Sequence, residues 1–182
     1  MSDESSNELE VLLRDDPIGT LHRKARELSK QAAPDRQTAV YKEVINIPQL
    51  KEEWEELRRK LSIEAIDVNT FPENYRESIL VLYCDEHCLF CHVVKPTFAN
   101  LSRFLTKTRI YYSDNKELKK REGVTLTPLL MAYLPDGRKA GLFPGNTTQM
   151  LWDMMNLLPH FAEQPTGKNV TEGCEGETCI IR

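Results

Sequence analysis

The chain has 182 residues, of which 40% are hydrophobic and 29% are charged, and its formal net charge at pH 7 is −4. This length is typical of one domain with extensions, and a domain of this size can fold without disulfide bonds. The 24 Lys and Arg residues are fewer than the 28 Asp and Glu residues and form no stripe, so the composition argues against a nucleic-acid-binding protein.

No segment reaches the roughly 18 consecutive apolar residues that a membrane span needs. The stretch from Met1 to Ser5 is polar and acidic, so we expect no secretory signal and a protein of the cytosol or the nucleus. In such a reducing compartment, five cysteines are expected to act as thiols, catalytic groups or ligands rather than as a structural disulfide framework.

Residues 1–38 are predicted to be an N-terminal extension. Four apolar residues in it follow helical spacing: Ile18, Leu21, Ala25 and Leu28. This pattern predicts a short amphipathic helix that ends before Pro34 and lies on the domain or in solvent. A partner-binding helix is the alternative interpretation.

The first part of the domain that follows has three predicted segments. Ala39–Asn46 alternates between apolar and polar residues and is expected to form an edge strand. The next apolar stripe recurs at i, i+4, i+7 and i+11 and consists of Leu50, Trp54, Leu57 and Leu61. It predicts a helix that begins near Pro48. Residues 63–77 contain Pro72 and are expected to be mostly loop.

A buried strand and a kinked helix are predicted next. Ser78–Cys84 is a continuous apolar run of the length expected for a strand buried on both faces. The helix after it has one apolar face, formed by Val94, Phe98, Leu101 and Leu105. Pro96 falls inside this helix and should kink it.

The last elements complete an α/β pattern. Arg109–Ser113 and Leu129–Leu134 are predicted strands, with a helix-compatible segment between them. The turn residues Pro135-Asp136-Gly137 lead into a strand that should run to about Phe143. A final helix, capped by Thr147 or Thr148, has an apolar face of Met150, Leu151, Met154 and Leu158. Residues 39–162 are therefore expected to form a mixed sheet of four to five strands covered by helices, and residues 163–182 a flexible C-terminal tail.

The run Cys88-Leu89-Phe90-Cys91 carries the chemistry that the sequence suggests. Cys88 is expected at the first turn of a helix, where unpaired N–H groups and the helix dipole favour a thiolate and should lower its pKa. Cys91 lies one helical turn further on, within reach of the Cys88 sulfur. This asymmetry predicts Cys88 as the nucleophile and Cys91 as the resolving thiol.

Several features around this pair resemble the thioredoxin family. They are the Cys88-Leu89-Phe90-Cys91 run, Pro96, Thr127-Pro128, the Asp136-Gly137 turn and Gly145. The resemblance spans about 120 residues and implies a thioredoxin-like α/β fold. It also implies a cis peptide bond before Pro128, which would lie beside the cysteines while the backbone of Thr127 binds an extended substrate segment.

The chain also departs from the thioredoxin pattern. His87 and Leu89-Phe90 stand where thioredoxins usually have Trp and Gly-Pro. Leu82 replaces the buried Asp that accepts the proton of the resolving cysteine, so that step lacks its usual base. His92 is a candidate substitute, although an ordinary exposed histidine is the simpler interpretation. A protonated His87 would lower the pKa of Cys88.

Other interpretations of the cysteines stay open. Cys84, Cys88, Cys91 and His92 have a spacing that would suit zinc or an iron–sulfur cluster, but Cys84 is more simply a small core residue. Cys174 and Cys179 in the tail either accept a disulfide from the Cys88–Cys91 pair or are two exposed thiols. The ending Cys179-Ile180-Ile181-Arg182 has the form of a prenylation signal with an atypical last residue.

We therefore expect a protein-disulfide oxidoreductase in which Cys88 and Cys91 cycle between dithiol and disulfide. The expected partners are proteins with disulfides, which dock along Thr127 and Pro128, and a separate reductase that regenerates the dithiol. No cofactor and no metal are expected. The alternative is a thioredoxin-like interaction module with little or no redox turnover, which Leu82 and Leu89-Phe90 favour.

Overall fold

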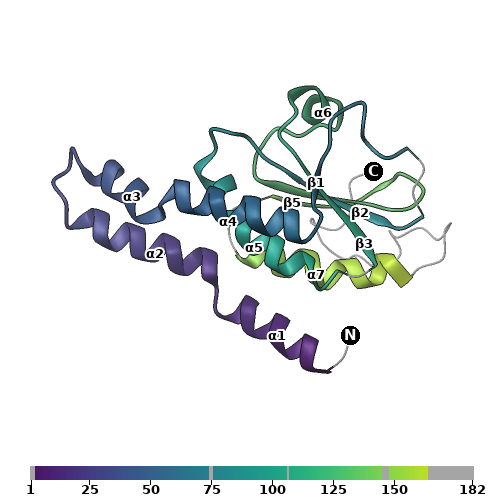
Figure 1. The fold of residues 1–182 in the computed structure, drawn as a ribbon, viewed down its shortest axis with the longest axis horizontal. Helices are drawn as coiled ribbons and strands as arrows, with labels where there is room; N and C mark the ends of the chain where they lie inside the picture. The colour runs from purple at the N-terminus through teal and green to yellow at the C-terminus, as the bar shows by residue number, and fades with distance from the viewer. Residues whose placement is uncertain (1–2, 74–75, 106, 145–147, 164–182) are drawn as a thin grey trace.

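The computed structural model describes residues 3–73, 76–105, 107–144 and 148–163 (Figure 1). Within these ranges the helices are α1 (Asp3–Arg14), α2 (Pro17–Lys30), α3 (Gln37–Ile45), α4 (Ile47–Lys60), α5 (Leu89–Ser102), α6 (Lys116–Arg121) and α7 (Thr148–Glu163). The strands are β1 (Glu64–Ala65), β2 (Ser78–Tyr83), β3 (Thr108–Ser113), β4 (Leu129–Tyr133) and β5 (Lys139–Pro144). None of the helices in this part of the chain has the length and apolar character needed to cross a membrane.

Some sequence predictions concern residues outside the described part of the chain. These are the tail from residue 164 onward with Cys174 and Cys179, the Cys-Ile-Ile-Arg ending, Gly145 and the Thr147 cap. They stay predictions.

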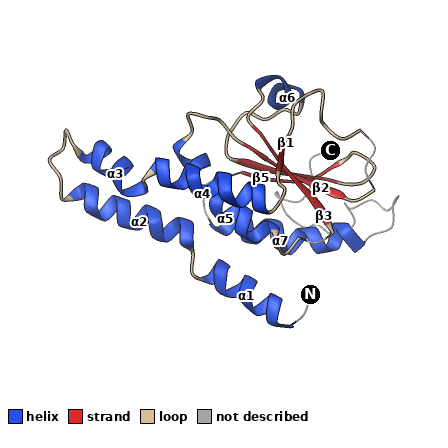
Figure 2. Cartoon of the chain, in the orientation of Figure 1, coloured by secondary structure: helices blue, strands red, loops and turns tan. Residues whose placement is uncertain are grey.

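The five strands form one mixed sheet in the order β1-β3-β2-β4-β5 (Figure 2). The central strand β2 is parallel to β3 and antiparallel to β4, while β1 pairs in parallel with the other edge of β3. β4 and β5 form an antiparallel hairpin, and the predicted turn between them has Gly137 at a φ of 87°. The predicted α/β class, with a mixed sheet of four to five strands flanked by helices, is confirmed.

Both faces of the sheet are covered, and β2 contributes to both cores. Its residues alternate, so Leu80 and Leu82 face the larger core together with Cys84, which directly follows the strand. The larger core lies under α4, α5 and α7, whereas the smaller one lies under α6 on the opposite face (Figure 1). All six residues of β2 are buried, which explains why its sequence is a continuous apolar run.

The predicted edge strand Ala39–Asn46 is wrong, because these residues belong to helix α3 and its C-cap. The alternation in this short segment is also compatible with a helix. The helix is favoured because α3 packs along α2 (Figure 1). Asn46 ends α3 in a left-handed conformation, with a φ of 55°, and its side chain accepts a hydrogen bond from the Gln49 amide at the start of α4. The predicted domain boundary at residue 39 therefore falls inside a helix.

The edge of the sheet is instead formed by β1, within residues predicted to be mostly loop. Only Glu64 and Ala65 pair with β3, and both are exposed. Two exposed residues leave no periodic pattern in the sequence, so this strand had no signal from which to be predicted.

The N-terminal extension is part of the main core. The predicted amphipathic helix is confirmed as α2, and α1 precedes it. Leu9, Leu13, Ile18 and Ala25 are all buried in the same core as β2 and α5. This extension therefore lies on the domain, as the simpler of the two interpretations predicts.

Replacing Ile18 by alanine should show how strongly α2 is held. Its side chain is 1% exposed, so we expect Ile18→Ala to lower the free energy of unfolding by about 2 to 5 kcal/mol. The matched control is Leu28→Ala on the same helix, where the side chain is 39% exposed and the change should stay within about 0.5 kcal/mol. Equal effects of the two substitutions in urea-unfolding curves would contradict the packing of α2 on the core.

Candidate active site

Cys88 is the N-cap residue of α5 and lies just after the loop that follows β2. Its backbone is extended, with φ −83° and ψ 110°, and its sulfur accepts a hydrogen bond from the Cys91 amide at 3.3 Å. The thiol thus occupies the place that a serine or aspartate cap usually fills, and it satisfies one of the unpaired N–H groups of the first turn. This is the position that the sequence predicted for the nucleophile.

The two cysteines of the motif differ in exposure. Cys91 is fully buried beneath the first turn of α5, whereas Cys88 is partly exposed. A disulfide in another protein can therefore reach the sulfur of Cys88 but not that of Cys91.

Thr127 and Pro128 lie beside Cys88, although they are about forty residues away in sequence. The Cys88 thiol is 3.7 Å from the backbone carbonyl oxygen of Thr127, to which it donates a weak hydrogen bond. The peptide bond between Thr127 and Pro128 is cis, as the resemblance implied. The structure thus brings the four residues predicted as catalytic and substrate-binding to one place.

Two exposed apolar side chains are close in sequence to these residues. Phe90, between the two cysteines, is 39% exposed, and Leu126, just before Thr127, is 68% exposed. Large apolar side chains at such exposure around a reactive thiol would favour contact with an apolar segment of another protein.

The two histidines near the motif have different surroundings. His87 is exposed, and its amide donates a hydrogen bond to the Asp85 carboxylate at 3.1 Å. His92 is buried, which corrects the expectation of an exposed ring, and its Nε2 lies 2.9 Å from the Glu86 carbonyl oxygen. Because a carbonyl only accepts, Nε2 carries the proton and is not free to act as a base. Burial lowers the pKa of His92.

The expected lowering of the Cys88 pKa is not found. Burial raises the pKa of Cys88, and its hydrogen bond to the Cys91 thiol raises it further. For Cys91, a hydrogen bond from the Cys84 thiol outweighs burial, and together with the bond from Cys88 it lowers the pKa to about 6.

The sequence predicts Cys84 as a core residue, and this is confirmed, but it does not indicate that Cys84 contributes to the lowered pKa of Cys91. It is fully buried and follows β2 on the same face as Leu82. The buried Nζ of Lys119 donates to the Cys84 carbonyl oxygen at 2.9 Å and lies 3.4 Å from the Asp85 carboxylate. Cys84 stands two residues after Leu82, and residues two apart in extended chain face the same side of a sheet. This spacing was the sequence signal that could have placed Cys84 on the α5 side of the sheet.

The four-ligand alternative for a metal is not supported by the arrangement of these groups. His92 points its Nε2 at a backbone carbonyl, and Cys84 is fully buried in the core. Among the described residues, no group of three or more His, Cys, Asp or Glu side chains is arranged to hold a metal ion.

The N-terminal extension also contacts the motif, which the sequence did not indicate. The ring of His22 on α2 lies 5.3 Å from the ring of Phe90, measured between centroids. His22 is held in turn by the hydroxyl of Tyr41 on α3, which hydrogen-bonds to its Nδ1. The two rings connect the helical extension directly to the residue between the cysteines.

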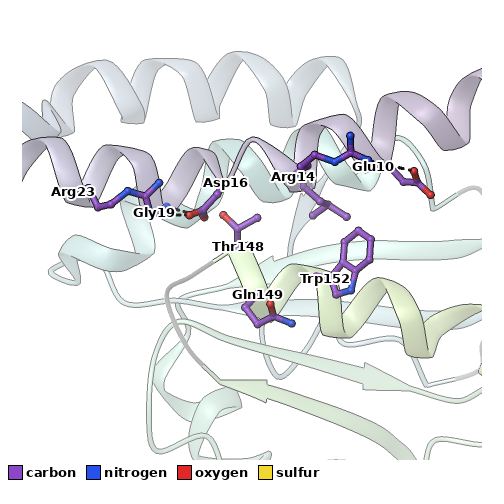
Figure 3. Close-up of a pocket in the computed structure, with 9 residues that line it drawn as sticks. Glu10, Arg14, Asp16, Gly19, Arg23, Thr148, Gln149 and Trp152 are labelled. Carbon is purple, nitrogen blue, oxygen red and sulfur yellow. Dashed lines mark hydrogen bonds and ion pairs between the residues drawn. The ribbon is translucent and has the colours of Figure 1, made fainter.

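A separate cavity of about 760 Å³ lies between α1, α2 and the start of α7 (Figure 3). Charged residues from α1 and α2 line it as two ion pairs, Arg14 with Glu10 and Arg23 with Asp16. Trp152 of α7 borders it on the other side. None of the residues predicted for the active site lines this cavity.

The sheet order, the cysteine pair at the start of α5 and the cis Thr127–Pro128 bond define a thioredoxin-like fold. No protein-family model matches the chain, and no curated protein matches its sequence. Thioredoxins are found among similar solved structures. Mitochondrial thioredoxin 3 from Saccharomyces cerevisiae, in its oxidized form, is 17% identical with a TM-score of 0.45, over 52% of this chain and 94% of that chain. Fasciola hepatica thioredoxin is 21% identical with a TM-score of 0.43, over 47% of this chain and 85% of that chain.

Proposed function

We propose that the chain is a protein thiol–disulfide oxidoreductase that uses Cys88 and Cys91. The observation that carries the proposal is the arrangement of the two sulfurs. Cys88 is accessible at the N-cap of α5, and Cys91 lies buried behind it with a lowered pKa. An exposed sulfur backed by an ionisable buried one is what a two-step exchange requires.

In the first step, the sulfur of Cys88 attacks a client disulfide. The Cys88 proton passes to the Cys91 thiolate as the new sulfur–sulfur bond forms; the backbone amide of Cys91 is hydrogen-bonded to the Cys88 sulfur at 3.3 Å. The client disulfide breaks, and its other sulfur leaves as a thiolate that takes a proton from water. Cys91 thus serves as the base for the nucleophile.

In the second step, Cys91 loses this proton to water and attacks the Cys88 sulfur of the mixed disulfide. The Cys88–Cys91 disulfide forms, and the bond between Cys88 and the client breaks. The client leaves with two thiols and has gained two electrons, while the cysteine pair has lost them. A separate reductase protein must return two electrons and two protons to the pair before the next cycle.

The client is proposed to bind beside Cys88 as an extended segment. The backbone of Thr127 lies next to the reactive sulfur, and the exposed side chains of Leu126 and Phe90 border the same place. Backbone contacts to Thr127 and Pro128, combined with apolar contacts, suit an extended segment of a protein client. We further propose that the protein meets this client in a reducing compartment, the cytosol or the nucleus.

The second candidate function is a thioredoxin-like interaction module with little redox turnover. Two observations favour it. Leu82 is fully buried where thioredoxins have their proton-accepting Asp, and the ring of Phe90 is engaged by His22 of the extension. In this interpretation the cysteines are retained mainly for binding.

A redox titration of the full chain separates the two functions. The reduced protein is equilibrated in glutathione buffers of graded potential, and the oxidation of Cys88 and Cys91 is followed by alkylation and mass spectrometry. We expect one reversible two-electron transition, together with catalysed reduction of insulin disulfides. A pair that stays reduced or oxidised across all buffers would leave the interaction module as the function.

A further inference from the structure

We propose that Lys119 is a positioning residue of this site, whose buried ammonium group holds the loop of residues 84–88 and thereby keeps the Cys88 sulfur at the start of α5. The inference rests on the proposed function, because it concerns how the nucleophile is held for its attack. Lys119 itself belongs to α6, which covers the other face of the sheet from α5 (Figure 1).

The ammonium group of Lys119 has two partners in this loop, which joins β2 to α5. Its Nζ donates to the Cys84 carbonyl oxygen at 2.9 Å and lies 3.4 Å from the Asp85 carboxylate. Lys119 is only 9% exposed, and a lysine is rarely buried to this extent unless its charge is paired. Moving the loop away from α6 would leave this charge without these partners, so the contact holds the two together.

Asp85 carries this constraint on to Cys88. Its Oδ2 faces Lys119, while its Oδ1 accepts a hydrogen bond from the His87 amide at 3.1 Å. Its backbone carbonyl accepts from the Cys88 amide, also at 3.1 Å, which closes a turn over residues 85–88. Lys119 thus fixes the first residue of a turn whose last residue is the nucleophile.

The backbone position of Cys88 determines what its sulfur contacts. The sulfur accepts from the Cys91 amide at 3.3 Å and lies 3.7 Å from the Thr127 carbonyl oxygen. Burial raises the pKa of Cys88, and the bond from the Cys91 amide acts in the opposite direction because it stabilises the thiolate. A loop that moves by about 1 Å would weaken this bond, so we expect Cys88 to become less reactive when the loop is released.

Substitutions on both sides of the contact test this role. Lys119→Met keeps a chain of similar length without the ammonium group, and Lys119→Arg keeps a positively charged donor. Asp85→Asn keeps the acceptor for the His87 amide but turns an amide group toward Lys119; it also serves if the methionine variant does not fold. Lys120→Met is the matched control, because Lys120 is the exposed neighbour on the same helix.

Two quantities are measured on the reduced full-length protein without any client. The first is the rate of hydrogen exchange of the Cys88 amide, followed by NMR. The second is the rate at which iodoacetamide alkylates Cys88 at pH 7, followed by mass spectrometry. A urea-unfolding curve of each variant shows that it is folded under these conditions.

We expect Lys119→Met to speed exchange of the Cys88 amide and to slow alkylation, each by about tenfold. Lys119→Arg and Lys120→Met should stay within about threefold of wild type. Asp85→Asn should act in the same direction as Lys119→Met and add little to it in the double variant, because the two side chains form one contact.

Unchanged exchange and alkylation in folded Lys119→Met, or in Asp85→Asn, would overturn the inference. Effects of the two substitutions that simply multiply in the double variant would overturn it as well, and so would an arginine variant that behaves like methionine. Because both rates are measured without turnover, a protein whose loop responds as expected but never reduces a client would refute only the proposed function.

Discussion

Replacing Cys88 by serine is expected to lower the rate of insulin disulfide reduction to the uncatalysed level, a loss on the order of a thousandfold or more. The hydroxyl of serine keeps the N-cap hydrogen bond from Cys91, so the fold should be retained. The loss would then reflect the missing sulfur alone. The measurement is multiple-turnover insulin reduction with a reductant supplied, alongside a thermal melt of each variant.

Cys91→Ser should differ from Cys88→Ser in a diagnostic way. The exposed sulfur of Cys88 remains, so it should still attack the client, but the mixed disulfide has no thiol to resolve it. We expect a covalent complex that survives denaturing gels without reductant and disappears with it. Lys120→Ala serves as the control, because Lys120 is exposed on α6 and is not one of the residues predicted for the site, so turnover should stay within a few-fold of wild type. A covalent complex formed by Cys88→Ser through Cys91 would contradict the assigned roles.

Introducing a carboxylate by Leu82→Asp, at the position where the resemblance to thioredoxins implies one, should destabilise this protein by about 3 kcal/mol or more at neutral pH. Leu82 is 0% exposed and lies in the larger core, to which α4, α5 and β4 also contribute buried apolar residues. A carboxylate there would lose its hydration. The measurement is the free energy of unfolding in urea at pH 4 and pH 8.

The comparison with Leu82→Asn isolates the charge. Burial would raise the folded-state pKa of the new carboxyl above its unfolded value of about 3.9. A raised folded pKa gives stability that is complete below the unfolded pKa and is lost as pH rises through the folded pKa. The two variants should therefore be similar at pH 4, and Leu82→Asp should be less stable at pH 8. Equal stability at both values would show that this core accepts a charged carboxylate.

The sequence predicted the elements that form the middle of the fold because each has a strong pattern. The apolar run of β2 and the helical stripe of α5 identify a buried strand and the helix that covers it. The segment Ala39–Asn46 failed because a short alternation also fits a helix, and the choice depends on packing against α2. β1 failed because two exposed paired residues carry no pattern at all.

The sequence predicted which residues lie together at the site, but it did not predict the direction of the pKa shift at Cys88. The strand-to-helix junction was enough to place Cys88 at the start of the helix, and the resemblance to thioredoxins implied Thr127 as its neighbour. The lowered pKa of Cys91 depends first on Cys84, which lies outside the motif, directly after β2. Local sequence at the motif therefore pointed to Cys88, whereas the three-dimensional arrangement favours the buried sulfur.

The burial of Leu9, Leu13 and Ile18 in the main core has a practical consequence for how this protein can be divided. A fragment that begins at residue 39, the start expected for the thioredoxin-like domain, would lose α1 and α2 and uncover the apolar surfaces of α5 and α7 that they contact. An exposed face of that kind promotes self-association. Expression of this fragment should give aggregates, and a soluble, folded unit should require the chain from α1 onward.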